Sequence, residues 1–199
     1  MTHAELLDAV WAAVPDGAEP ERFAVRRDWL LARVAAGETV LDHGCGEGAF
    51  TAALAGHGAQ PIGVDAAPRA LRRARERRTD LDWRLVALDR PLPLEDESVD
   101  VAWLGETLEH LVDPVGELHD VRRVLRPGGR LLLTTPDHPP ELVHRLADDP
   151  AAFAEHFSPR IDHLRFFNAT SLRELLADLG FQDVEVESDG ETLFATARW

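Results

Sequence analysis

The stretch VLDHGCGEGAF occupies residues 40–50 and carries three glycines at alternate positions, 44, 46 and 48. It begins as a short apolar strand and ends in helix-forming residues from Ala49 onward. Because glycine lacks a Cβ atom, the backbone between strand and helix can turn sharply and approach a ligand closely. Free N–H groups at the start of the helix would then face a carboxylate or a phosphate. The stretch predicts a ligand-binding strand–loop–helix unit, and the alternative is an ordinary tight turn.

Apolar patterns typical of helices and strands alternate along the chain. We expect helices over residues 3–14, 21–36, 49–56, 68–78, 114–126 and 171–179. We expect strands over residues 40–43, 61–65, 83–88, 98–103, 130–134, 184–188 and 193–198. A tight turn at 189–190 requires the last two strands to be antiparallel. The pattern predicts an α/β fold with a Rossmann-like, doubly wound sheet of seven strands: five parallel strands plus a terminal antiparallel hairpin, with helices on both faces.

Composition argues against a nucleic-acid-binding, membrane-spanning or secreted protein. The formal net charge of −15 argues against a nucleic-acid partner, because phosphate binding needs a clustered basic surface. No apolar run approaches the roughly 18 residues of a membrane span. Acidic residues such as Glu5 and Asp8 make residues 1–14 unlike a signal peptide. The single cysteine, Cys45, excludes an internal disulfide and fits a reducing compartment, so we expect a cytoplasmic protein without a membrane partner.

A second acidic residue follows the glycine-rich stretch, at the end of the next predicted strand. Asp65 ends the strand predicted over 61–65, whereas Asp42 lies two residues before the first glycine. An acid at the end of the second strand of such a sheet can accept both hydrogen bonds from a ribose diol. The alternative for Asp65 is a helix cap or a turn cap. Nicotinamide-dependent reductases use a different glycine spacing, G-x-G-x-x-G, and this chain has no tyrosine for a Tyr-x-x-x-Lys pair.

These motifs, in this order, resemble class I S-adenosylmethionine-dependent methyltransferases. Three further stretches, LEHLVDP at 108–114, VLRPGGR at 124–130 and FFNATSL at 166–172, look like the small single-domain type. That type includes ubiquinone-biosynthesis and natural-product O-methyltransferases. The resemblance implies S-adenosyl-L-methionine as cofactor, with Asp42 and the glycine loop at its amino-acid end and Asp65 at its ribose.

The resemblance also implies which residues bind the cofactor. They are Asp42, Gly44, Cys45, Gly46, Gly48, Asp65, Ala66, Asp89 and Gly105. Asp89 follows the third strand, where the family often supplies an acid to the adenine amino group. Ala87 is the other candidate for that position, in which case Asp89 is a turn residue.

Titratable residues gather after the fourth strand, in Glu106-x-x-Glu109-His110. Ligands of open α/β sheets bind at the carboxyl ends of the strands. Residues three apart on a helix share a face, so we expect Glu106 and Glu109 to converge with His110 beside them. Methyl transfer to oxygen requires a positioned acceptor and usually a base, so the catalytic candidates are His110, Glu106 and His138.

The E-x-x-E-H pattern resembles the metal motif of RNA 3′-terminal 2′-O-methyltransferases and ubiquinone-type O-methyltransferases. The resemblance implies a metal site of Glu106, Glu109, His110 and His163. Two carboxylates and two imidazoles suit Mg²⁺, Mn²⁺ or Zn²⁺, which would chelate neighbouring hydroxyls of the acceptor. In the alternative, Glu106 caps a turn, His110 packs beside the cofactor and one histidine acts alone as base. His144 and His156 are expected at the surface or in a lid.

We therefore expect one methyltransferase domain over 1–199. Its parts are N-terminal helices at 1–36, a cofactor-binding core at 37–135, a substrate lid insertion at 136–167, and the last helix and hairpin at 168–199. The predicted reaction is O-methylation of a small hydroxylated metabolite. The alternatives are N-methylation of a small molecule and a non-catalytic, methyltransferase-like subunit.

Overall fold

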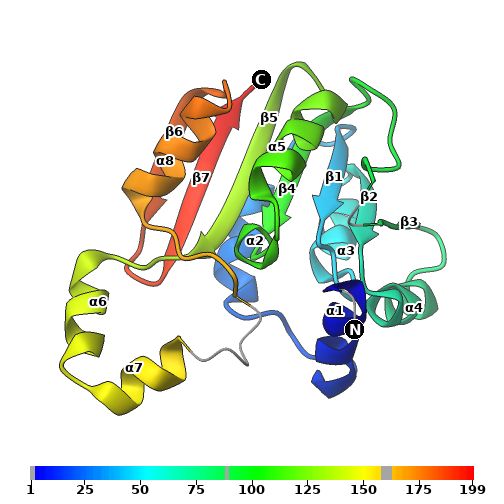
Figure 1. Ribbon diagram of the computed structural model, residues 1–199. Helices are drawn as coiled ribbons and strands as arrows, with labels where there is room; N and C mark the ends of the chain where they lie inside the picture. The colour runs from blue at the N-terminus through cyan, green and yellow to red at the C-terminus, as the bar shows by residue number, and fades with distance from the viewer. Residues whose placement is uncertain (1–2, 88–89, 158–162) are drawn as a thin grey trace.

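A computed structural model describes residues 3–87, 90–157 and 163–199 of the chain (Figure 1). The strands are β1 (Thr39–His43), β2 (Gln60–Asp65), β3 (Asp82–Leu85), β4 (Val99–Gly105), β5 (Leu125–Pro136), β6 (Gln182–Ser188) and β7 (Thr192–Arg198). The helices are α1 (His3–Ala13), α2 (Phe23–Leu31), α3 (Ala49–Gly56), α4 (Pro68–Arg77), the 3₁₀ helix η1 (Leu108–His110), α5 (Pro114–Val124), α6 (Pro140–Ala147), α7 (Pro150–His156) and α8 (Ala169–Asp178).

All seven strands form one sheet in the order β3-β2-β1-β4-β5-β7-β6. The strands β1 to β5 are parallel, and β7 lies antiparallel to both β5 and β6. Strand order reverses between β1 and β4, so the carboxyl ends of β1, β2 and β4 meet at the position where open α/β sheets bind ligands. The predicted fold class is confirmed.

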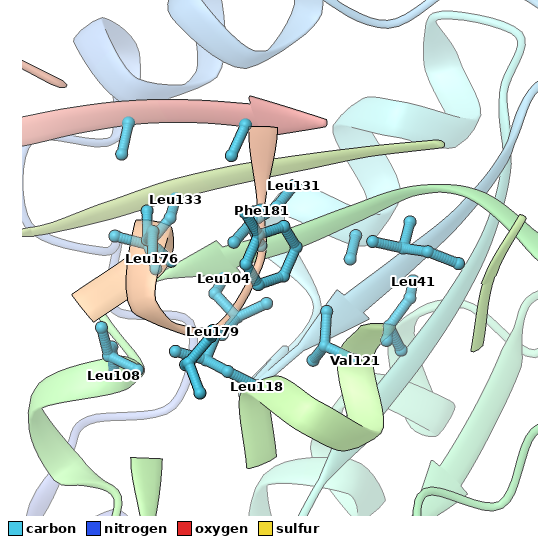
Figure 2. Packing of buried hydrophobic residues seen from close by; sticks show 14 of the residues in the cluster. Leu41, Leu104, Leu108, Leu118, Val121, Leu131, Leu133, Leu176, Leu179 and Phe181 are labelled. Carbon is cyan, nitrogen blue, oxygen red and sulfur yellow. The ribbon is translucent and has the colours of Figure 1, made fainter. Parts of the chain in front are cut away.

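Helices cover both faces of the sheet because successive strand residues point to opposite faces. On β5, Leu131 and Leu133 join a core with Leu118 of α5 and Leu176 of α8 (Figure 2). The intervening Leu132 packs in a second core with α2 and α3. Burying one such leucine side chain stabilises the fold by about 1.5–3 kcal/mol. The nearly continuous apolar sequence of β5 therefore reflects burial on two sides.

The second helix is shorter than predicted. It was expected over 21–36, whereas α2 spans Phe23–Leu31. Arg22 has a left-handed backbone with φ of 52°, which prevents the helix from starting earlier. After Leu31 the chain turns, and the N–H of Gly37 donates to the carbonyl of Gly58 instead of continuing the helix.

The insertion between β5 and α8 contains α6 and α7, which extend away from the sheet beyond the carboxyl end of β5 (Figure 1). Its two ends meet again at the sheet. Asp137 forms a β-bridge with Phe167, and the N–H of His138 donates to the carbonyl of Phe167 over 2.8 Å. The insertion is thereby anchored beside the strand ends that face the candidate site.

The N-terminal helix α1 packs against α4, so it lies beside the carboxyl end of β2 (Figure 1). The Asp8 carboxylate accepts a hydrogen bond from the N–H of Arg69 over 2.7 Å. The first turn of α4 has no side-chain cap of its own, so Asp8 satisfies one of its free donors. Among the described helices, none has the length and apolar character to cross a membrane.

Candidate active site

Asp65 ties the end of β2 to the glycine loop. One carboxylate oxygen accepts from the N–H of Gly46 and the other from the N–H of Ala67, each over 2.8 Å. The residue is 8% exposed. Burial raises the pKa of Asp65, and the backbone donors at Ala67 and Gly46 oppose this rise. Each oxygen keeps a second lone pair for another donor.

Asp42 lies at the end of β1 and is almost completely buried. The hydroxyl of Thr51, on α3, donates to its Oδ2 over 2.5 Å. Burial raises the pKa of Asp42 to about 7, although the Thr51 hydrogen bond lowers it. A buried carboxyl of this kind favours a cationic neighbour, because a positive charge stabilises its ionised form.

Side chains from other elements hold the glycine loop closely. A Cβ atom at Gly46 would lie 2.6 Å from the ring of Trp11 on α1. A Cβ atom at Gly44 would lie 2.4 Å from the hydroxyl of Thr107. Glu47 accepts from the N–H of Gly17 over 3.0 Å, which links the loop to the N-terminal segment. A Cβ atom at Gly48 would likewise overlap the ring of Trp83, so packing alone favours glycine at all three positions, in addition to any approach of a ligand.

The remaining predicted cofactor residues lie around the same edge of the sheet. Gly48 is the N-cap of α3, and Ala66 is buried immediately after β2. Cys45 is buried, and burial raises the pKa of its thiol well above the ordinary value. Gly105 ends β4, whose Leu104 pairs with His43 of β1. Asp89 lies outside the described residues.

Glu106 does not lie on a helix with Glu109. It has a left-handed backbone with φ of 54°, and the 3₁₀ helix η1 begins only at Leu108. The expected helical spacing of the two residues is therefore wrong, although the charge of Glu106 does act on Glu109. The Glu106 carboxylate instead lies 3.4 Å from Nη1 of the buried Arg26, as an ion pair. Burial raises the pKa of Glu106, and the charge of Arg26 opposes this.

Glu109, His110 and His163 come together. One potential ligand atom from each lies within 4.8 Å of the others. The hydroxyl of Thr135 donates to Oε2 of Glu109 over 2.9 Å, whereas the buried Oε1 has no hydrogen-bond partner among the described residues. Burial, and then the charge of Glu106, raises the pKa of Glu109 to about 8. A divalent cation would supply the missing partner of Oε1.

The backbone explains how His163 reaches this cluster from a distant part of the chain. The N–H groups of Leu164 and Arg165 both donate to the carbonyl of Glu109, over 2.7 and 3.1 Å. The imidazole rings of His110 and His163 then meet edge to face, with 4.8 Å between their centroids. Two backbone hydrogen bonds thus fix the end of the insertion against η1.

His138 lies outside this cluster, at the end of β5, and is 8% exposed. Its Nδ1 lies 3.2 Å from the carbonyl oxygen of Pro136. A carbonyl can only accept, so Nδ1 carries the proton and Nε2 keeps a free lone pair. Burial, and then the neighbouring His156, lowers the pKa of His138, which favours the neutral ring.

Comparison with known proteins identifies the family. Residues 18–186 match a family model described as a methyltransferase domain. The chain belongs to this family. The methyltransferase is 35% identical over 169 residues to a demethylmenaquinone methyltransferase of Tropheryma whipplei, a match that covers 75% of this chain and 69% of the relative. It is 34% identical over 169 residues to a ubiquinone biosynthesis O-methyltransferase of Xanthomonas campestris, covering 80% of this chain and 70% of the relative.

Solved structures of methyltransferases share the fold of this chain. One chain of a complex between the Haloferax volcanii Trm112 methyltransferase activator and a methyltransferase matches with 26% identity and a TM-score of 0.74, covering 96% of each chain. A SAM-dependent methyltransferase from Aquifex aeolicus shares the fold at 18% identity and a TM-score of 0.68, covering 100% of this chain and 98% of that one. The chain is a class I methyltransferase with S-adenosylmethionine as its cofactor.

The site of the methyltransferase contains residues that sequence reasoning missed. Thr51 belongs to none of the sequence motifs, and only the fold brings its hydroxyl to the Asp42 carboxylate. Arg26 is 2% exposed on α2, where its guanidinium lies 5.0 Å from the ring centroid of Phe50. Its Nε and Nη1 have no hydrogen-bond partner within the described residues. A buried cation of this kind is a signal in a structure, but one arginine among many gives no signal in a sequence.

Proposed function

We propose that the methyltransferase transfers the sulfonium methyl group to a hydroxyl oxygen of a small hydroxylated metabolite. The observation that supports this most is the cluster of Glu109, His110 and His163 beyond the carboxyl end of β4, on the sheet edge that also holds Asp42 and Asp65. The cluster offers proton-accepting and metal-binding groups beside the expected cofactor site. The printed name of the Xanthomonas relative, an O-methyltransferase, supports oxygen as the methylated atom.

The residues at the ends of β1 and β2 fit the cofactor. The buried Asp42 carboxyl would pair with the ammonium group of the methionine end, and the free lone pairs of Asp65 would accept from the two ribose hydroxyls. Arg26 already forms an ion pair with Glu106, and its Nε, which has no hydrogen-bond partner among the described residues, would donate to the carboxylate of the same methionine end. S-adenosylmethionine supplies the electrophilic methyl group, and these residues orient it toward the acceptor.

The residues of the cluster also fit a divalent metal ion. The orphaned Oε1 of Glu109 and the imidazoles of His110 and His163 would hold it, whereas Glu106 is engaged with Arg26. Such an ion would act as a Lewis acid on an acceptor hydroxyl. Holding it would also favour the ionised form of Glu109, whose pKa burial raises. An acceptor with two adjacent hydroxyls suits this arrangement, and the α6–α7 insertion would wall its other side.

The competing base is His138. Its Nε2 lone pair can accept a proton without any metal, because Nδ1 already donates to Pro136. The metal mechanism and the His138 mechanism predict different effects of a chelator on turnover. If the metal cluster activates the acceptor, chelation abolishes turnover. If His138 acts alone, turnover survives chelation.

The test is transfer of labelled methyl groups to catechol and to phenol, with and without a strong chelator. We expect catechol to be methylated, phenol to be poor, and chelator to remove activity while S-adenosylhomocysteine still binds. Glu109→Gln should lose activity in the same way, whereas Glu141→Gln, an exposed acid on α6, should not. Undiminished methylation in excess chelator would overturn the metal and leave His138 as base. Methylation of amines only would overturn the O-methylation itself.

A further inference from the structure

His43 is a buried histidine at the carboxyl end of β1, where only 3% of it is exposed. It pairs in the parallel sheet with Val64 of β2 and Leu104 of β4. Asp65 follows Val64 along β2, and Asp42 precedes His43 along β1. The imidazole is therefore flanked along the sheet by the two acids that are expected to bind the cofactor.

The His43 side chain lies on the α5 face of the sheet. Successive residues of a strand point to opposite faces, so Asp42 contacts Thr51 of α3 whereas the His43 ring reaches α5. There its Nε2 lies 3.4 Å from Oε2 of Glu117. The Glu117 side chain is only 18% exposed, so solvent and salt screen this contact weakly.

The second ring nitrogen of His43, Nδ1, is buried and has no hydrogen-bond partner among the described residues. A histidine that only fills space is expected to satisfy both ring nitrogens, because an unpartnered buried polar atom is unfavourable. The neighbouring strands fill the same level of the sheet with the apolar Val64 and Leu104. The histidine at this position therefore indicates a role for its charge.

Charged groups face His43 from three elements. Glu117 of α5 contacts the ring, and Asp42 of β1 and Asp65 of β2 interact with it through space. Burial has the largest effect on the pKa of Asp42 and on that of Asp65, and it raises both. The charge of His43 is one of the influences that lower them.

The other acids of α5 near Glu117 have partners of their own. Asp113 caps the start of the helix, and Asp120 pairs with Arg123 over 2.6 Å. Glu117 is thus the acid of this helix that contacts the imidazole of His43.

We infer that His43 is a positioning residue of the cofactor site. Its imidazolium, paired with Glu117, keeps the carboxylates of Asp42 and Asp65 ionised for the cofactor. Histidine ordinarily changes charge between pH 5 and 8, and a neighbouring opposite charge favours the charged form of each partner. The inference rests on the proposed roles of Asp42 and Asp65, and it adds a residue that acts on the cofactor through them.

The first test measures the affinity for S-adenosylhomocysteine between pH 6 and pH 8.5. His43→Gln removes the charge but keeps a side-chain donor for Glu117. We expect it to bind about threefold more weakly than wild type, or worse, at pH 6. The difference should close toward pH 8.5, where the wild-type imidazole also loses its charge. His119→Gln is the matched control, because His119 is an exposed histidine of α5, and it should match wild type throughout.

The second test does not require a folded His43 variant. ¹⁵N NMR follows the ring protonation of His43 in the full chain as pH rises. Coupling between two sites is reciprocal, so a carboxylate that gains from the imidazolium also favours the ring proton. Asp42→Asn and Glu117→Gln should each make His43 lose its ring proton at a lower pH than in wild type. In Asp42→Asn, His119 should titrate as in wild type.

Either of two results would overturn the inference. One is an affinity of His43→Gln that equals that of wild type, or that is lower by the same factor at every pH, as a merely structural role predicts. The other is a His43 ring whose protonation is the same in wild type, Asp42→Asn and Glu117→Gln. Neither test includes a methyl acceptor, so a failure of the proposed O-methylation would leave this inference standing.

Discussion

At the scale of single residues, two buried carboxyl groups define the two halves of the site. Burial raises the pKa of Asp42 to about 7 and that of Glu109 to about 8. Each therefore gains most from a cationic partner, which would be the ammonium group of the cofactor for Asp42 and a divalent ion for Glu109. Among the described residues, neither carboxyl forms a salt bridge of hydrogen-bonding length. We propose that the ligands supply the cationic partner of each.

Binding of S-adenosylhomocysteine should depend on pH through Asp42. The raised pKa means that the carboxyl is largely protonated below about pH 7 in the free protein. If only the ionised form pairs with the ligand ammonium, affinity should rise about tenfold from pH 6 to pH 8. Calorimetry in buffers of different ionisation enthalpy should detect proton release near pH 6.5. Asp42→Asn should bind weakly and without this release, and a wild-type affinity that is flat over the same range would contradict the role.

The stability of the free protein should also depend on pH through Asp42. A carboxyl whose pKa is raised by folding binds more protons in the native state, so its contribution to stability is lost as pH rises toward the folded pKa. Asp42→Asn should therefore tolerate urea better, relative to wild type, at pH 8 than at pH 5. A difference in the free energy of unfolding that does not change with pH would show that the carboxyl is not perturbed.

Asp65 should contribute directly to cofactor affinity. Replacing it by alanine removes an acceptor of charge-assisted hydrogen bonds, which should weaken binding by about 1.5–3 kcal/mol. Asp80→Ala is the control, because Asp80 is an exposed acid that pairs with the neighbouring Arg78. Circular dichroism should confirm that both variants fold. Equal affinity of Asp65→Ala and wild type would remove Asp65 from the cofactor site.

At the scale of elements, periodicity and glycine positions predicted the existence of most helices and strands but not all of their ends. The apolar spacing in 171–179 indicated the last helix, and Ser171 and Glu174 have the spacing of a capping box that would start at Ser171. The true N-cap is Asn168, and Ser171 is the third helical residue of a capping box. Caps depend on the backbone geometry of the preceding residue, which a pattern of residue types does not specify.

The cap of α8 gives a stability test. The Asn168 side chain accepts from the N–H groups of Thr170 and Ser171, over 3.0 and 2.9 Å. Asn168→Ala should lower the free energy of unfolding by about 1 kcal/mol, because two helical donors lose their partner. Thr170→Ala, which keeps the backbone donor and changes only an exposed side chain, should stay within about 0.5 kcal/mol of wild type. Urea unfolding measures both, and equal effects of the two variants would contradict this role of the cap.

The same dependence on backbone geometry explains why the conformation of Glu106 was not predicted. Glu106 and Glu109 were expected on one helical face, but Glu106 has a left-handed backbone and precedes the 3₁₀ helix. Positive φ at a residue other than glycine is uncommon, so nothing in the pattern E-x-x-E-H predicts it. The grouping of Glu109 and His110 with His163 does agree with the motif, although their roles stay a prediction.

At the scale of the whole molecule, the strand order brings distant segments to one edge of the sheet. The alternation of helices and strands predicted a doubly wound sheet, and the strand order in the structure brings the ends of β1, β2 and β4 together. Sequence reasoning did not place Arg26 of α2 at this edge. Arg26 belongs to a segment outside the alternating core, and only tertiary packing determines which side chains that segment brings to the site.

The most direct measurement is anomalous diffraction from crystals of the S-adenosylhomocysteine complex grown with Mn²⁺. The account predicts an ion bound by Glu109, His110 and His163, with metal–oxygen and metal–nitrogen distances of about 2.0–2.3 Å, on the edge of the sheet that also holds the ligand. An ordered ligand with no anomalous peak among these three side chains at millimolar Mn²⁺, together with full methylation activity in excess chelator, would contradict it.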